Sequence, residues 1–148
     1  FSCASQKSGK EQHLVPYYIS GHPGSTTHSM IELALYLKKR GLRPRQVQDF
    51  IPTPMSMATS MYVTGLDPFT QEPVYVAKGL REKRMQKALL QYWDVDQHDL
   101  AREALIKAKR GDLIGSSERH LVPPATGKGA LSIHERRRRQ RTGKPTRR

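Results

Sequence analysis

The sequence is poor in cysteine, in long apolar runs and in acidic side chains, and each shortage excludes a class of protein. Its 148 residues include one cysteine, which cannot form an internal disulfide or alone supply a cysteine-rich zinc site or an iron–sulfur cluster. No apolar run approaches the roughly 18 residues that span a bilayer, and the first residues are unlike a signal peptide. The expectation is a soluble, cytoplasmic protein with one domain, or one small domain and a tail.

An initial methionine is also missing, because residue 1 is Phe. A natural full-length product starts with Met unless it has been processed. We therefore expect either a trimmed N-terminus or a piece of a longer chain.

Acidic side chains are half as frequent as basic ones, and the imbalance is uneven along the chain. There are 26 Lys and Arg against 13 Asp and Glu, a net charge of +13. Residues 1–115 carry 16 basic and 11 acidic side chains, whereas residues 116–148 carry 10 and 2. Nearly all large apolar side chains precede Gly115. The sequence predicts a structured part at 1–115 and a basic tail at 116–148, disordered from about residue 123 because it has too little to bury.

The first half of the structured part has the pattern of a βαβ unit. Residues 13–20 form an apolar run typical of a buried parallel strand, although Pro16 removes a backbone donor. Residues 46–51 form a second strand-like run. A helix lies between them, with hydroxyl residues to cap its start and Gly41 to end it. Its apolar face is spaced at i, i+3, i+4 and i+7 by Met30, Leu33, Ala34 and Leu37.

The second half predicts a hairpin followed by two helices. The β-rich segments 61–64 and 74–77 flank a loop, which favours a hairpin. After Gly79 the apolar period becomes helical again. One predicted helix buries Met85, Ala88, Leu89 and Tyr92, and the other buries Ala101, Ala104, Leu105 and Ala108.

Two parallel strands are too few for an independent sheet. An all-parallel sheet needs more strands and helices on both faces. Together with the first residue, this indicates the C-terminal portion of a larger α/β protein.

Polar residues follow both predicted strands at the edge where α/β folds bind ligands. The first strand leads through Gly21-His22-Pro23-Gly24 into a helix N-terminus, which favours anionic groups. An ordinary βα turn with His22 as a turn residue explains the same pattern. Gln48 and Asp49 at the end of the second strand favour a ligand site, or one of them faces solvent.

Several segments in combination carry a resemblance to a known family. They are LVPYYISGHPGST, LRPRQVQDFIPTPMSMATSMYVTGLDP, PVYVAKGLREKRMQKALLQYW, the Leu-Ile-Gly near residue 114 and the HLVP at 120–123. From about Leu14 to Pro123 the chain closely resembles the C-terminal third of YgiQ-type radical SAM proteins. The resemblance implies the end of a radical SAM (β/α) partial barrel at 1–60, a family-specific extension of a hairpin and two helices at 61–115, and the tail at 116–148.

The resemblance also implies cofactors for the intact protein. Radical SAM proteins hold three irons of a [4Fe–4S] cluster on a Cys-x-x-x-Cys-x-x-Cys loop, and the fourth iron binds S-adenosylmethionine (SAM). Reductive cleavage of SAM gives a 5′-deoxyadenosyl radical that abstracts hydrogen from the substrate. By analogy the first strand ends near the adenosyl group, and the second points toward the adenine or the substrate. The candidate cofactor-binding residues are Ile19, Ser20, His22, Gln48, Asp49 and Phe50.

The cluster motif itself is absent from this chain. Cys3 is the only cysteine and precedes the matched region. We therefore expect the cluster loop upstream of Phe1 in the intact protein, with no catalytic or metal-ligating residue here. The chain alone should hold no cofactor and be inactive, and its partners are the missing N-terminal part and an unknown substrate.

The arginine-rich tail supports an alternative function. Dense arginine binds phosphate through charge and counterion release, so the chain could be a small basic nucleic-acid-binding protein. No aromatic residues are interleaved with the arginines, and a solvated tail with non-specific affinity explains the same run. The possible nucleic-acid contacts are Arg136, Arg137, Arg138, Arg139 and Arg141.

Overall fold

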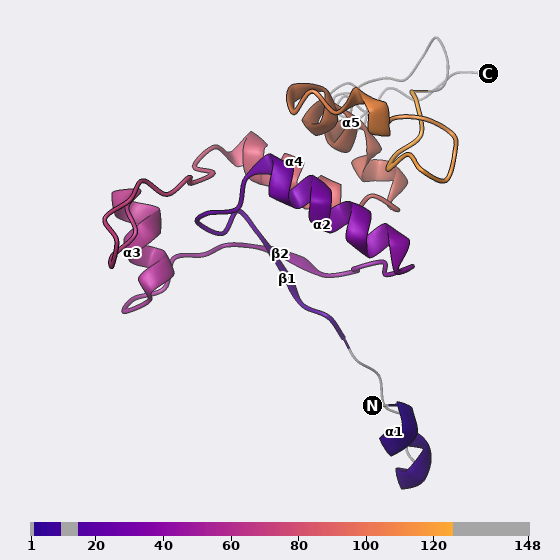
Figure 1. The fold of residues 1–148 in the computed structure, drawn as a ribbon, viewed down its shortest axis with the longest axis horizontal. Coiled ribbons are helices and arrows are strands. Elements are labelled where there is room, and N and C mark those ends of the chain that lie inside the picture. The colour runs from indigo at the N-terminus through magenta and orange to yellow at the C-terminus, as the bar shows by residue number, and fades with distance from the viewer. Residues whose placement is uncertain (1, 10–14, 126–148) are drawn as a thin grey trace, which may run out of the picture.

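The computed structural model describes residues 2–9 and 15–125 as a mixed α/β fold. Five α-helices, two strands and two short 3-10 helices occur within these residues (Figure 1). In chain order they are α1 (Ser2–Ser8), β1 (Tyr18–Ser20), α2 (Thr27–Lys39), β2 (Val47–Asp49), α3 (Met57–Thr64), α4 (Leu80–Leu90), η1 (Val95–Gln97), α5 (His98–Lys107) and η2 (Gly111–Leu113).

The predicted βαβ unit is confirmed. Strands β1 and β2 pair in parallel with Tyr18 opposite Val47 and Ser20 opposite Asp49, and α2 crosses between them. Both strands are shorter than the apolar runs that predicted them. Pro16 has no N–H to donate, and β1 begins two residues after it.

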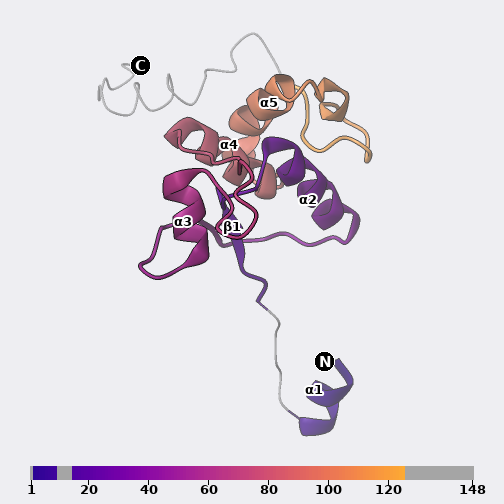
Figure 2. The ribbon, with the colours of Figure 1, turned by 60° about the vertical axis from the view of Figure 1, so that its left-hand side comes forward.

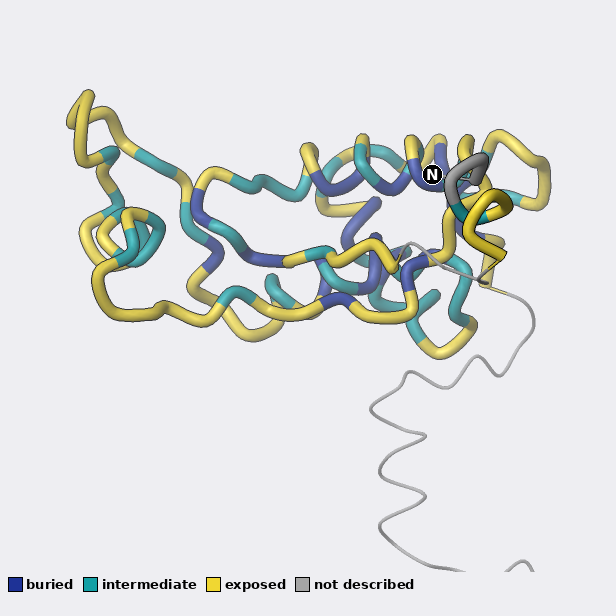
Figure 3. The backbone as a smooth tube through the Cα atoms, turned by 90° about the horizontal axis from the view of Figure 1, so that it is seen from below, coloured by how far each residue is buried: buried dark blue, intermediate teal, exposed yellow. Residues whose placement is uncertain are grey.

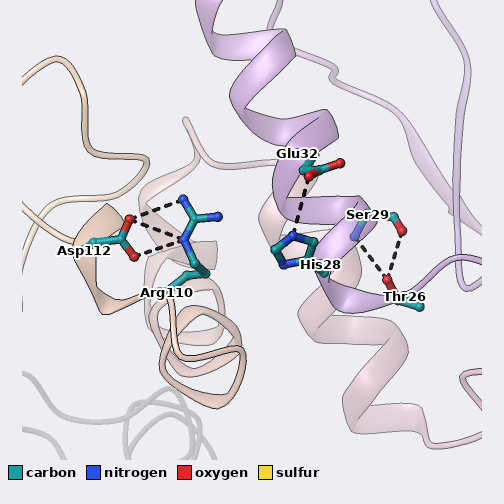
Figure 4. A network of polar contacts seen from close by, with 6 residues as sticks. All are labelled: Thr26, His28, Ser29, Glu32, Arg110 and Asp112. Atoms are coloured by element: carbon teal, nitrogen blue, oxygen red, sulfur yellow. Dashed lines mark hydrogen bonds and ion pairs between the residues drawn. The ribbon is translucent and has the colours of Figure 1, made fainter.

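Helix α2 begins and ends where its capping residues predicted. The Thr26 hydroxyl accepts a hydrogen bond from Ser29 N at 3.1 Å (Figure 4). At the other end Gly41 adopts a φ of 66°, and Leu42 N donates to Leu37 O across the helix end, as in a glycine C-cap. The sequence signals for this helix therefore act locally.

Two ion pairs lie on the surface near the start of α2, outside the hydrophobic core. His28 and Glu32 lie one turn apart at 3.5 Å, and Arg110 pairs with Asp112 at 3.0 Å on the segment that faces the helix (Figure 4). Glu32 adds to the main effect of Asp112, which raises the pKa of Arg110. These exposed pairs contribute little to stability.

Three helices form a layer over one face of the small sheet. Figures 1 and 2 show α2, α4 and α5 together on the same side of the strands, and Figure 3 shows their inward faces buried. Both predicted apolar faces after Gly79 lie in this core, except that Ala108 is half-buried and packs against it. The core includes Met30, Ile31, Ala34, Leu37, Val47, Met85, Ala88, Leu89, Leu90, Tyr92, Ala101, Ala104 and Leu105.

The other face of the sheet is open. Tyr17 is 56% exposed and Ile19 is 41% exposed. By contrast, Ser20, at the end of β1, is fully buried. The prediction that this strand is buried on both faces is therefore wrong for the residues described. A continuous apolar run signals burial in the complete sheet, and here only one face has a covering layer.

The predicted hairpin at 61–64 and 74–77 is wrong. Residues 61–64 belong to helix α3, which ends at Gly65 with a φ of 71° and a Gly65 N to Met61 O hydrogen bond. The Ser56 carbonyl accepts from Thr59 N and Ser60 N at the start of the helix. These terminal bonds outweigh the β-propensity of a run only four residues long.

A compact loop replaces the hairpin. The Asp67 carboxylate accepts hydrogen bonds from Phe69 N and Thr70 N, and these bonds lower the pKa of Asp67. Antiparallel pairing is limited to one bridge between Leu66 and Pro73. Proline cannot donate to a ladder, so the bridge does not extend into a strand pair.

The chain after α5 returns to the core. Leu121 and Val122 are 2% and 1% exposed, and Val122 bridges to Ile114. These two residues lie in the segment 116–148 that was predicted as the basic tail, ahead of its predicted disordered portion. In the part of the chain that the structure describes, the sheet has two strands, and no helix is long and apolar enough to cross a membrane.

Candidate functional site

The carboxyl ends of β1 and β2 are joined through their side chains. Ser20 is fully buried, and its hydroxyl lies 2.8 Å from Asp49 Oδ1 and donates to it. Asp49 is exposed, and only its Oδ1 takes part in this contact. A buried hydroxyl therefore fixes the orientation of an exposed carboxylate at the strand ends.

A side chain of helix α4 is hydrogen-bonded to the turn after β1. Gly21 adopts a φ of 70°, and its N–H donates to Gln86 Oε1 at 2.8 Å. The Gln86 amide nitrogen donates to Ser25 O at 2.9 Å. Gln86 is fully buried, so one side chain satisfies both ends of the His-Pro-Gly turn.

Aromatic rings and one cation lie around this turn. The His22 and Phe50 rings meet edge to face, with their centroids 5.2 Å apart. The centroids of the Phe50 ring and the Tyr62 ring of α3 are 5.7 Å apart. The Lys83 ammonium lies 4.8 Å from the Tyr62 ring centroid, and donates to the Tyr62 hydroxyl at 3.1 Å. We call Ser20, His22, Asp49, Phe50, Tyr62 and Lys83 the strand-end cluster.

The predicted site residues fall into two groups. Ser20, His22, Asp49 and Phe50 lie together in the strand-end cluster. Ile19 and Gln48 are paired across the strands and are both exposed. Their side chains alternate with those of Ser20 and Asp49, so they belong to the open face of the sheet.

Three residues of this region, Tyr62, Lys83 and Gln86, are not among the predicted site residues. Tyr62 lies in a segment that the sequence predicts as a strand, and Lys83 and Gln86 lie in a predicted helix outside its apolar face. Only Gln86 had a usable cue, because it follows Met85 at the edge of the apolar stripe. Gln86 lies 61 to 65 residues from the turn atoms that it contacts, and Lys83 lies 21 residues from Tyr62, so no local pattern predicts these contacts.

The chain matches the family described as "Domain of unknown function (DUF3362)" over residues 45–148. This match covers more than half of the sequence. The chain belongs to this family. The matched region is the C-terminal part of UPF0313 proteins. UPF0313 is the YgiQ-type radical SAM family, so the family predicted from the resemblance is confirmed.

Curated relatives support the same assignment. The chain is 56% identical over 119 residues to a UPF0313 protein of Clostridium botulinum (strain Loch Maree / Type A3), covering 80% of the chain and 18% of the relative. It is 52% identical over 122 residues to a UPF0313 protein of Methanosarcina acetivorans, covering 82% of the chain and 16% of the relative. The chain thus spans under a fifth of these relatives. No solved structure gives a significant match.

The DUF3362 segment does not fit an iron–sulfur cluster. Among the described residues, no group of three or more His, Cys, Asp and Glu side chains could hold a metal ion. Cys3 is the single cysteine of the sequence. A [4Fe–4S] cluster needs several thiolates, so its ligands cannot come from this segment.

The arginine-rich tail lies outside the described residues. This applies to each of the possible nucleic-acid contacts, Arg136, Arg137, Arg138, Arg139 and Arg141. The tail therefore stays a prediction from sequence.

Proposed function

We propose that the chain forms the C-terminal end of a radical SAM barrel and that its strand-end cluster contributes to the SAM site of the complete polypeptide. The parallel β1–α2–β2 unit carries the proposal. Its carboxyl ends bring Ser20, His22, Asp49 and Phe50 together beside an open sheet face. Ligands of α/β folds bind at this edge of a parallel sheet.

The cluster offers hydrogen-bonding groups that suit a nucleoside. Ser20 holds one oxygen of Asp49, and the other oxygen can accept a hydrogen bond from a ribose hydroxyl. Phe50 and His22 present an apolar edge beside it for a purine ring. Bound in the complete polypeptide, SAM and the [4Fe–4S] cluster would supply hydrogen abstraction from a substrate of unknown identity.

The open sheet face suits the remainder of the same barrel. Tyr17, just before β1, and Ile19 of β1 lie uncovered, whereas helices pack against the other face of this strand. A parallel sheet needs both faces and its edges covered. The upstream part of the polypeptide is the partner that this arrangement calls for.

Binding of SAM tests the role of Asp49. In the complete polypeptide, we expect Asp49→Asn to weaken SAM binding about tenfold in calorimetry, the effect of one hydrogen bond to a charged group of about 1.5 kcal/mol. The matched control is Asp96→Asn, an exposed carboxylate before α5, which should leave binding unchanged. Equal SAM affinities of Asp49→Asn and the parent protein would contradict the proposed site.

Iron–sulfur reconstitution tests the inactivity of this segment alone. Under anaerobic conditions with iron and sulfide, the 148-residue chain should gain no cluster absorbance near 400 nm and form no 5′-deoxyadenosine. The complete polypeptide should do both. Cluster formation by the short chain would show that its own residues suffice and would overturn this part of the proposal.

A further inference from the structure

A second charged surface lies at the far end of α2. Residues 38–45 read KKRGLRPR, with five basic and no acidic side chains. Four of the five are exposed, and the fifth, Lys38, is half-buried. Helix α2 has 13 residues and so is about 20 Å long, which separates this loop from the strand-end cluster at the helix start. Figures 1 and 2 show the loop and α3 at opposite ends of the molecule.

These cations are not neutralised by the part of the chain that the structure describes. No ion pair within residues 15–125 involves Lys39, Arg43 or Arg45, and Arg40 lies over the Tyr36 ring at 5.5 Å. The carboxylates nearest in sequence make other contacts. Glu32 lies 3.5 Å from His28, and Asp49 accepts a hydrogen bond from the Ser20 hydroxyl. Five cations within eight residues, with no carboxylate paired to them in the described residues, repel one another, and a bound anion would relieve that repulsion.

An aromatic cavity of about 490 Å³ adjoins the loop. Its lining is Lys38, Gly41, Arg43, Tyr92, Trp93, His98 and Leu121. The Trp93 indole N–H donates to Pro44 O at 3.2 Å, and the Tyr92 hydroxyl donates to Leu42 O at 2.9 Å. The two bonds hold the basic loop against the end of α4, so cations and an aromatic ring share one rigid surface.

The last described residues of the chain lie at this end of the molecule. Lys38 Nζ donates to His120 O, and Leu121 lines the cavity. The described chain ends four residues later, at Ala125, and the sequence beyond it carries the arginine run. The described chain therefore ends within a few residues of a residue that lines the cavity.

We propose that this surface binds single-stranded nucleic acid, with phosphates on the exposed guanidiniums of loop 38–45 and a base against Trp93. Cations that follow a backbone, combined with an aromatic platform, are the two elements of single-strand recognition. The folded residues supply the aromatic group that the arginine tail lacks. The surface is distinct from the strand-end cluster, so its function does not depend on the proposed SAM site.

Trp93 reports on its own contact, because it is the only tryptophan of the chain. Titration of the 148-residue chain with a 12-nucleotide oligouridine should give a saturable loss of Trp93 emission. Inorganic polyphosphate of similar charge should bind without that loss. Equal quenching by both, or none by the oligonucleotide, would overturn the proposal.

Matched charge variants separate a local surface from net charge. The triple variant Arg40→Gln, Arg43→Gln, Arg45→Gln should bind labelled oligouridine about tenfold more weakly at 0.1 M salt. Its plot of log affinity against log salt should lose about 2 units of slope, since each single-strand phosphate contact contributes about 0.7. The control is Lys78→Gln, Arg84→Gln, Lys87→Gln, which removes the same charge from the α4 region and should change both values by less than half as much.

Two outcomes complete the test. A chain ending at Ala125 should bind more weakly but keep the quenching of Trp93, because the aromatic contact lies in the folded part. Loss of quenching on that truncation, or equal weakening by the two triple variants, would assign the binding to the tail or to net charge and overturn the proposal. Far-UV circular dichroism checks that each variant is folded. If the triple variant of loop 38–45 does not fold, the single variant Arg43→Gln takes its place.

Discussion

At the scale of single residues, Gln86 has the most demanding position in the molecule. It is fully buried and pairs with Gly21 N and Ser25 O at the two ends of one turn. Replacement by Leu keeps the volume but leaves a donor and an acceptor unpaired, each at a cost of about 1–3 kcal/mol. We expect Gln86→Leu to lower the free energy of unfolding by about 2–6 kcal/mol, measured by urea denaturation.

A matched glutamine separates burial from the loss of an amide. Gln46 is exposed just before β2, so Gln46→Leu should change the free energy of unfolding by no more than about 0.5 kcal/mol. Similar values for the two variants would contradict the anchoring role of Gln86.

Half of the candidate site could be predicted because its residues belong to strand ends. Ser20, His22, Asp49 and Phe50 follow two apolar runs, and parallel pairing brings such ends together. Gln86 and Lys83 could not be predicted, because a glutamine or lysine in a helix is ordinary wherever it faces solvent. Only the packing of α4 against the turn makes them part of this region.

At the scale of elements, an ion pair joins α4 to α5. Arg81 of α4 makes a two-pronged contact with Glu103 of α5, at 2.9 and 2.8 Å, and Lys107 approaches Glu103 at 3.2 Å. The hydrogen bonds from Arg81 hold the pKa of Glu103 below its ordinary value. The contribution to stability is therefore complete above the ordinary carboxyl pKa of about 4.3 and is lost as the pH falls through the lower, folded-state pKa.

The pair predicts a pH-dependent effect of Glu103→Gln. At pH 7 the variant should be less stable by no more than about 1 kcal/mol, because the pair is partly exposed. The difference in free energy of unfolding from the parent chain should shrink toward pH 3. Urea denaturation at several pH values measures this difference. Glu118→Gln is the control, since Glu118 has no ion pair among the described residues, and a cost of Glu103→Gln that does not change with pH would contradict the assignment.

Elements with strong local signals were predictable, and those with mixed signals were not. Helix α2 has a capping threonine, an apolar stripe and a terminal glycine that agree with one another. Residues 57–64 include β-prone Tyr and Val, but backbone hydrogen bonds to Ser56 O start a helix there and Gly65, at a φ of 71°, ends it. The loop at 65–74 depends on the Asp67 carboxylate and on Pro73, whose effects on strand pairing appear only once the backbone is folded.

At the scale of the whole molecule, a substantial helical layer covers one face of a two-stranded sheet. Tyr17 and Ile19 stay exposed on the other face, and the outer edge of each strand has no strand partner within the described residues. Exposed strand edges favour association with other chains. The isolated chain should therefore be marginally stable and prone to aggregation, and a cooperative transition typical of a mesophilic domain would contradict the incomplete-sheet interpretation.

Substitution of Ile19 by Lys distinguishes an open face from a covered one. In the isolated chain, Ile19→Lys places charge on an exposed apolar surface, so light scattering should fall while the melting temperature changes little. In the complete polypeptide the same lysine would be buried against the rest of the barrel, and the melting temperature should drop by several degrees, as expected for an unpaired buried charge. The control is Ile106→Lys. Ile106 of α5 is 65% exposed, so this substitution should leave the melting temperature of both proteins unchanged. An Ile19→Lys variant as stable in the complete polypeptide as the parent would show that this face stays open, and the proposed barrel would then need a different partner for the sheet.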